Sequence, residues 1–157
     1  MNILLCVDVQ REFAKDLHGK RLYQKLLTFI SEAHTIYDKV IALVYENKDN
    51  LNMRRMVCWD EMEVPENLEF RADDYYFHSG YCPLELPKFT ITDTVDVIGY
   101  DTDACVLATC FRLFDANVSF QILVNGIWSS GGKKAHQVGL VVMNRQFKKA
   151  VNTTHKI

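Results

Sequence analysis

The chain has 157 residues, of which 48% are hydrophobic and 24% are charged, a composition typical of a globular protein rather than a disordered or fibrous one. Its formal net charge of −2 gives no reason to expect binding to nucleic acid or to an anionic membrane surface. No stretch approaches the roughly 18 consecutive apolar residues that a membrane-spanning helix needs.

The cysteine content bounds the compartment and the class of protein. An odd number of cysteines, with no C-x-x-C pair and no zinc-finger spacing, argues against a disulfide framework. We therefore expect reduced thiols and a cytoplasmic location. The chain has no internal repeat, low-complexity tract or Pro/Gly/Ser linker, so we expect a single domain over residues 1–157. The cysteines are Cys6, Cys58, Cys82, Cys105 and Cys110.

Near-continuous apolar, β-rich runs predict strands at residues 2–9, 39–45, 95–100 and 118–125. Such runs are typical of strands buried on both faces of a parallel sheet. Residues 46–87 are the least regular part, with a short strand predicted at 68–71.

Helical periodicity lies between these runs, and it predicts three helices. Strands that alternate with helices predict an α/β fold, a three-layer sandwich with a mainly parallel sheet flanked by helices. The apolar stripes are Leu22, Leu26, Ile30, Ala33 and Tyr37, then Val106 and Cys110 or Leu107, Phe111 and Phe114, then Ala135, Val138, Val142 and Phe147.

Ligands of open α/β sheets bind at the carboxyl ends of the strands, which places Asp8, the region after Arg71 and the turn 101–105 near one another. Cys105 falls in the first turn of a helix that Asp101, Thr102 or Asp103 could cap. Unpaired N–H groups and the helix dipole favour a thiolate there, although a small buried cysteine is the alternative.

Asp8 ends a buried apolar run, where an isolated charge is costly. It could be the base that deprotonates a thiol, or a structural aspartate that caps the following loop. Gln10 and Phe13 could line the same pocket.

Two stretches, "LLCVDVQREF" and "DVIGYDTDACVLATCFRLFDANVSFQILVNG", resemble the isochorismatase-like cysteine hydrolase superfamily, which includes nicotinamidases. The resemblance implies that Asp8 is the base and Cys105 the nucleophile. It also implies a cis peptide between Tyr100 and Asp101, with the backbone N–H groups of Asp101 and Cys105 as the oxyanion hole. The family's Asp and Gln after strand one, and its G-x-x-T-D-x-C-V-x-x-T motif, are matched by Asp8, Gln10, Gly99, Thr102, Asp103, Cys105, Val106 and Thr109.

The family also has a lysine at the end of its third strand, and this sequence has none there. In "LEFRADDYYFHSGYCP", three alternative registers put Arg71, Tyr75 or His78 in its place. We prefer Arg71 as the third catalytic residue, since it keeps the positive charge, although it cannot give up a proton. His78 could move a proton near neutral pH.

Nicotinamidases carry an Asp-x-His and further histidines after strand two that hold a divalent metal, whereas "VYENKDNLNMRRMVCWDEM" contains no histidine. We therefore expect no metal and no cofactor. Isochorismatases themselves typically lack the cysteine, so the presence of Cys105 also argues against isochorismatase activity. We expect substrate contacts from Gln10, Phe13, His78, Tyr100 and Asp101. Trp59, Tyr75, Tyr76, Phe77 and Trp128 could wall a pocket or a subunit interface, although packing is the more frequent role of aromatic residues.

These features predict a metal-independent cysteine hydrolase that cleaves an amide or ureide C–N bond of a small molecule through a thioester. The alternative is a catalytically weak or inactive member of the same fold that binds a small molecule or serves assembly. A phospho-receiver domain is disfavoured, because the acid pair and the lysine that it needs are missing. The family often assembles into dimers or tetramers, so we expect a homo-oligomer.

Overall fold

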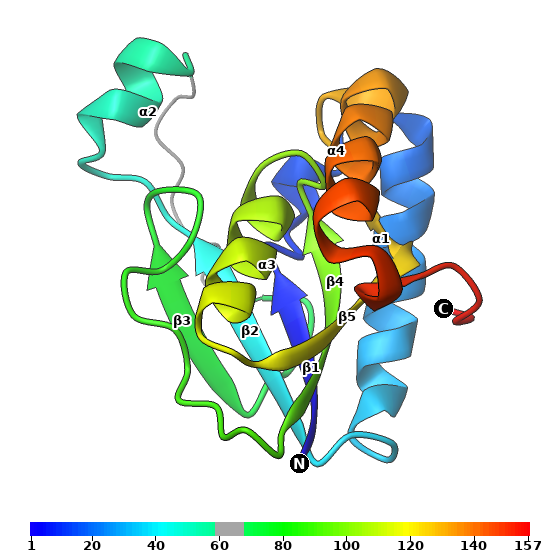
Figure 1. Cartoon of the computed structure of the whole chain (residues 1–157). Coiled ribbons are helices and arrows are strands. Elements are labelled where there is room, and N and C mark those ends of the chain that lie inside the picture. The colour runs from blue at the N-terminus through cyan, green and yellow to red at the C-terminus, as the bar shows by residue number, and fades with distance from the viewer. Residues whose placement is uncertain (59–67) are drawn as a thin grey trace.

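The computed structural model describes residues 1–58 and 68–157. Within these residues the chain forms a six-stranded sheet in which every paired strand is parallel to its neighbour (Figure 1). The order across the sheet is β3-β2-β1-β4-β5-β6. The strands are β1 (Asn2–Val7), β2 (Lys39–Tyr45), β3 (Asp74–His78), β4 (Thr94–Tyr100), β5 (Ser119–Trp128) and β6 (Val151–Asn152).

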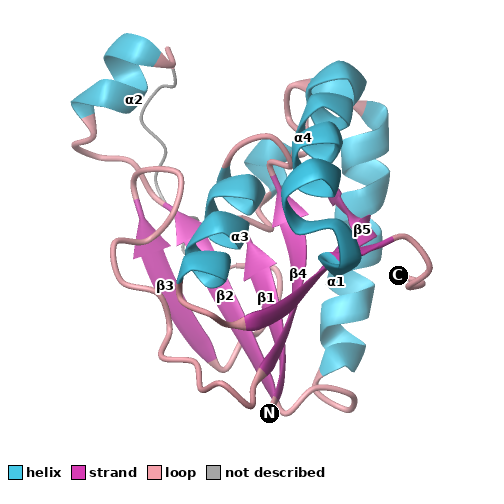
Figure 2. Ribbon diagram, viewed as in Figure 1, coloured by secondary structure: helices cyan, strands magenta, loops and turns pink. Residues whose placement is uncertain are grey.

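Helices cover both faces of the sheet, with α1 on one face and α3 and α4 on the other (Figure 2). Alternate residues of β1 supply the two cores: Leu4 packs in the core that α1 covers, and Leu5 packs in the core under α3 and α4. No helix in the described ranges is both long and apolar enough to cross a membrane. The helices are α1 (Leu17–Ala33), α2 (Leu51–Met56), α3 (Cys105–Asp115) and α4 (Gly132–Phe147), with 3-10 turns at Arg11–Phe13 and Lys148–Ala150.

The predicted α/β sandwich is confirmed, but the short strand predicted at 68–71 is wrong. The edge strand is β3, which pairs with β2 from Ile41 opposite Asp74 to Tyr45 opposite His78. Burial alternates along β3, so its sequence does not form the continuous apolar run that marks the inner strands. The other predicted strands correspond to β1, β2, β4 and β5, and β5 continues to Trp128.

The strand order reverses direction between β1 and β4, and open α/β sheets bind their ligands outside the carboxyl ends of the strands at such a switch point. The two strands approach closely there, with Val7 opposite Gly99. Gly99 has φ +124°, and a Cβ atom at this position would lie 1.9 Å from the carbonyl oxygen of Val7. Glycine is therefore required where β4 leads into the turn that carries Cys105.

Candidate active site

Asp8 and His78 form a buried pair at the carboxyl edge of the sheet. Asp8 follows β1 and is fully buried, and His78 ends β3 and is 6% exposed. Their closest atoms, Asp8 Oδ1 and His78 Nε2, lie 2.7 Å apart. The other ring nitrogen, Nδ1, lies 2.9 Å from the carbonyl oxygen of Gly80. Because a carbonyl and a carboxylate both accept hydrogen bonds, both contacts are favourable when the two ring nitrogens carry protons.

The surroundings of His78 favour this protonated form. Burial by itself lowers the pKa of the imidazole, but the charge of Asp8, its hydrogen bond and the carbonyl of Gly80 raise it, and the net shift is upward. His78 therefore provides a positive charge beside Asp8.

The second oxygen of Asp8 is the unusual atom of this pair. Oδ2 is buried, and no described residue makes a hydrogen bond to it. A buried carboxylate oxygen without a donor is costly, so such atoms are uncommon unless they have a role. The carboxylate interacts with the thiol of Cys105, whose pKa it raises. The contact that raises the pKa of Cys105, a side-chain contact between the thiol and the Asp8 carboxylate at hydrogen-bond range, places Asp8 to accept the thiol proton.

Cys105 is the first residue of α3, as the sequence predicted for a residue in the first turn. The predicted cap is wrong, because the N-cap residue is Ala104 and no side chain caps the helix. Instead, the backbone carbonyl of Asp101 accepts hydrogen bonds from the amides of Ala104 and Val106, each at 3.0 Å. The side chains of Asp101, Thr102 and Asp103 are engaged with Ser130, His136 and Ser129, respectively.

The thiol of Cys105 does not have the lowered pKa that its helix position predicted. Burial raises the pKa of this thiol well above its ordinary value, and the negative charges of Asp8 and Asp101 raise it further. Only a hydrogen bond from the backbone N–H of Asp101 acts in the opposite direction. The free protein therefore holds a neutral thiol that needs a base before it can act as a nucleophile.

The peptide bond between Tyr100 and Asp101 is cis, in agreement with the resemblance. The side chain of Tyr100 is fully buried, and its hydroxyl donates to the carbonyl of Gly19 at 2.8 Å. Tyr100 therefore packs toward α1 and does not line the cavity described next, whereas Asp101 does.

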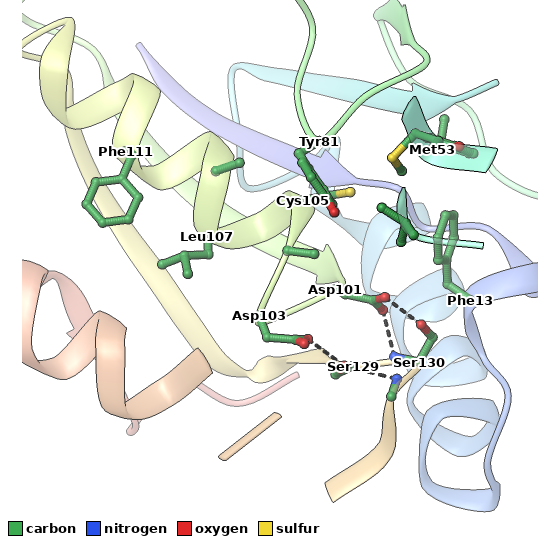
Figure 3. Close-up of a pocket in the computed structure, with 15 residues that line it drawn as sticks. Phe13, Met53, Tyr81, Asp101, Asp103, Cys105, Leu107, Phe111, Ser129 and Ser130 are labelled. Carbon is green, nitrogen blue, oxygen red and sulfur yellow. Dashed lines mark hydrogen bonds between the residues drawn. The ribbon is translucent and has the colours of Figure 1, made fainter. Parts of the chain in front are cut away.

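A cavity of about 520 Å³ opens beside Cys105 (Figure 3). Phe13, one of the predicted substrate contacts, lines it. Gln10 does not line it, because its amide nitrogen donates to the carbonyl of Tyr45 at 3.1 Å and its oxygen accepts from the amide of Tyr45 at 2.8 Å. The side chain of Gln10 thus holds the loop after β1 against the end of β2 through two hydrogen bonds.

The structure does not bring Arg71 to this site. Arg71 is exposed and precedes β3, and its carbonyl lies 3.2 Å from Nε2 of His34, the residue that ends α1. It is therefore at the amino-terminal end of the strand, whereas Asp8 is at the carboxyl edge. Tyr75 is 40% exposed, and its hydroxyl accepts from the amide of Ala72. Of the three alternatives for the family lysine, His78 is the residue beside Asp8.

Sequence reasoning missed Ser129 and Ser130, which follow β5 and line the cavity. Their position after a strand of the same parallel sheet was the signal that could have found them. Of the aromatic residues proposed as walls, Trp59 lies outside the described residues. Trp128 packs against the rings of His18 and His136, at centroid distances of 3.9 and 4.4 Å.

No protein-family model and no curated protein sequence matches this chain. Solved structures do match it. The nicotinamidase PncA from Bacillus subtilis is 15% identical, with a TM-score of 0.71 over 96% of this chain and 98% of that chain. The pyrazinamidase/nicotinamidase from Streptococcus mutans is 13% identical, with a TM-score of 0.74 over 97% of this chain and 100% of that chain.

The N-carbamoylsarcosine amidase from Thermoplasma acidophilum is 16% identical, with a TM-score of 0.71 over 99% of this chain and 98% of that chain. These likenesses define the class of fold: a parallel α/β sandwich of the isochorismatase-like type. The resemblance that the sequence motifs indicated is thus confirmed at the level of the fold.

Proposed function

We propose that this protein is a cysteine hydrolase that cleaves an amide or ureide C–N bond of a small molecule through a thioester intermediate. The observation that carries the proposal is the buried Oδ2 of Asp8, which has no hydrogen-bond donor and belongs to the carboxylate that interacts with the Cys105 thiol. A nucleophile with a base in contact and a third group that orients the base is the general arrangement of covalent catalysis.

In the first step, Asp8 takes the proton of Cys105 as the sulfur forms a bond to the carbonyl carbon of the substrate. The backbone N–H of Asp101 already points at this sulfur, and the N–H of Cys105 has no acceptor within its helix. Two such donors suit the oxygen that becomes negative as the sulfur adds.

In the second step, the C–N bond breaks, and the departing nitrogen takes the proton from Asp8 to leave as a neutral amine. Water then adds to the thioester, gives one proton to Asp8 and releases a carboxylic or carbamic acid. The proton returns to the sulfur, so the thiol and the carboxylate are regenerated.

His78 takes the place of the family lysine in this scheme. It is a positioning residue, because it holds Oδ1 of Asp8 and leaves Oδ2 for the thiol. Its charge also limits the cost of a buried carboxylate next to a thiol that becomes an anion.

The scheme needs no metal, since residues of this chain carry every proton and charge in it. The described residues contain no group of three or more His, Cys, Asp or Glu side chains that could hold a metal ion. The segment after β2, where nicotinamidases have their histidines, offers Asn47 and Asn50 instead.

The test is a panel of small primary amides and ureides, with ammonia release as the readout and intact mass as the measure of a thioester on Cys105. We expect turnover by the wild type, no turnover by Cys105→Ala, and wild-type turnover by Cys58→Ser, which alters an exposed thiol. If Cys105→Ala binds a panel compound that the wild type also binds but never cleaves, the protein is a small-molecule-binding member of this fold, and the hydrolase proposal fails.

A further inference from the structure

The cavity beside Cys105 has an acidic side. Asp101 and Asp103 both line it, and Figure 3 shows them next to Ser129 and Ser130. No lysine, arginine or histidine is among its described lining residues. The stretch 59–67, which the structure does not describe, contains no basic residue in its sequence either. The part of the cavity wall that the structure describes therefore contains no cationic side chain.

Neutral donors hold both carboxylates. The backbone N–H of Ser130 donates to Asp101 Oδ1 at 2.7 Å, and the hydroxyl of Ser130 donates to Oδ2. The hydroxyl of Ser129 donates to Asp103 Oδ1 at 2.6 Å. Neither aspartate forms an ion pair with a described residue. The serines fix the carboxylates in place without cancelling their charge.

A second observation concerns the atoms next to the nucleophile. Asp8 is fully buried and does not line the cavity itself, and its carboxylate contacts the Cys105 thiol, which does line it. The imidazolium of His78 balances the charge of Asp8 through Oδ1. Asp101 and Asp103 form no ion pair with a described residue, so the described lining of the cavity contains two carboxylates and no cationic side chain.

The rest of the cavity wall is apolar and partly aromatic. The faces of aromatic rings attract a cation, and hydrocarbon walls suit the carbon skeleton of a small ligand. An anionic ligand would instead meet two carboxylates and no positive partner, which is strongly unfavourable in a partly dehydrated site. These wall residues include Phe13, Tyr45, Met53, Tyr81, Leu107 and Phe111.

From this arrangement we infer that the substrate carries a protonated nitrogen, an ammonium or amidinium group that binds against Asp101 and Asp103 while its amide or ureide carbonyl meets Cys105. The part of this inference that places a carbonyl at Cys105 rests on the proposed function, whereas the part that places a cation at Asp101 and Asp103 does not. It excludes amides with a free carboxylate as good ligands.

Binding of a cation would also assist the chemistry. Burial and the negative charges of Asp8 and Asp101 hold the Cys105 thiol in its protonated form in the free protein. A positive charge next to Asp101 offsets part of this effect, so the thiol loses its proton more easily when the correct substrate is bound.

The test uses three primary amides of similar length that differ in charge: 4-aminobutanamide, pentanamide and succinamate, which are cationic, neutral and anionic. Binding is measured by ligand-observed NMR titration of Cys105→Ala, which cannot turn these amides over. The titration is carried out at pH 8, because burial raises the pKa of the Asp101 carboxyl to about 6. Ammonia release by the wild type is measured in parallel.

We expect the cationic amide to bind at least about tenfold tighter than the neutral one, and the anionic one to bind weakest. Asp101→Asn and Asp103→Asn, made separately in the Cys105→Ala protein, should each reduce this preference several-fold. Asp115→Asn, at the exposed end of α3, makes the same change in net charge away from the cavity and should not alter it.

Failure of the cationic amide to bind, or binding no tighter than that of succinamate, overturns the inference whatever the wild type does. A cation preference that survives in both cavity variants overturns the assignment to Asp101 and Asp103. If the cationic amide binds best and the wild type releases no ammonia from it or from its homologues, the inference stands and the hydrolase proposal fails.

Discussion

Asp8 and His78 are 70 residues apart in the sequence, yet Oδ1 of one lies 2.7 Å from Nε2 of the other in the interior of the protein. Two parallel strands bring them together, because β1 and β3 flank β2 and all three end at the same edge of the sheet. The proposed mechanism takes its base, Asp8, and the cation that holds it, His78, from this pair, which joins two separate parts of the chain.

If the charge of His78 is what the site needs, His78→Lys should keep turnover within about tenfold of the wild type, and His78→Gln should lose about 100-fold or more in kcat/KM. The pH profile separates this role from mere packing. The pKa of His78 is raised above its ordinary 6.5, so the wild type should lose kcat/KM as the pH rises through that higher value and the imidazolium disappears. In His78→Lys that limb should move toward the pKa of lysine, about 10.

Two results would contradict this role for His78. An alkaline limb at the same pH in the lysine variant would show that another group titrates there. Equal activity of the lysine and glutamine variants would show that the charge is not used.

Asp8→Asn should separate the electrostatic effect of Asp8 from its role as a base. The charge of Asp8 raises the pKa of the Cys105 thiol. The rate at which iodoacetamide alkylates Cys105 should therefore have a lower pH midpoint in Asp8→Asn than in the wild type. Hydrolysis should nevertheless fall by about 10³-fold or more, because the proton acceptor is gone.

Peptide mass spectrometry identifies the labelled cysteine, and thermal unfolding checks that the variant folds. Asp115→Asn is the matched control for net charge and should leave both readouts unchanged. A midpoint that stays in place or rises in Asp8→Asn would mean that the carboxylate does not act on this thiol.

Much of the fold could be predicted from the sequence, because its inner strands are buried on both faces and read as continuous apolar runs. The same logic placed Asp8 and Cys105 at the carboxyl edge of the sheet. The edge strand β3 could not be predicted in this way, because its burial alternates and it forms no continuous apolar run. Its aromatic residues are equally compatible with a pocket wall. As a consequence, the sequence does not distinguish Arg71, Tyr75 and His78 as the residue at the position of the family lysine.

The charge state of Cys105 could not be predicted in the same way. Its place at the start of a helix is a local feature, and local reasoning favoured a thiolate. The decisive causes are burial and two carboxylates, and one of these, Asp8, follows a strand nearly a hundred residues earlier in the sequence. The prediction of Arg71 is wrong for a related reason, because its residue type does not indicate at which end of β3 the side chain lies.

Asp101 should make the stability of the protein depend on pH. Burial and the charges of Asp103 and Asp8 raise its pKa from 3.8 to about 6, against hydrogen bonds from Ser130 that lower it. Because the folded state disfavours the ionised form, the contribution of this group to stability is full below pH 3.8 and is lost as the pH rises to about 6.

Asp101→Asn lacks this titration. The free energy of unfolding of Asp101→Asn minus that of the wild type should therefore increase by about 2–3 kcal/mol between pH 4 and pH 7. Urea denaturation at each pH measures both values. Asp115→Asn, with an exposed side chain, should show no such gain. A constant difference between Asp101→Asn and the wild type over this range would show that Asp101 does not titrate as described.

The close contact between β4 and β1 leaves no room for a side chain at Gly99. A methyl group there would lie 1.9 Å from the carbonyl oxygen of Val7, and φ is +124°. Gly99→Ala should therefore lower the free energy of unfolding by about 3 kcal/mol or more, or prevent folding altogether.

Gly80→Ala is the matched control, because an added Cβ at Gly80 would meet only Asn50 Nδ2 at 3.8 Å. It should stay within about 0.5 kcal/mol of the wild type in urea denaturation, and the carbonyl that His78 contacts is kept. Equal stability of the two alanine variants would mean that β4 can shift away from Val7. The shape of the cavity beside Cys105 would then depend on the turn 100–105 rather than on the close contact of the two strands.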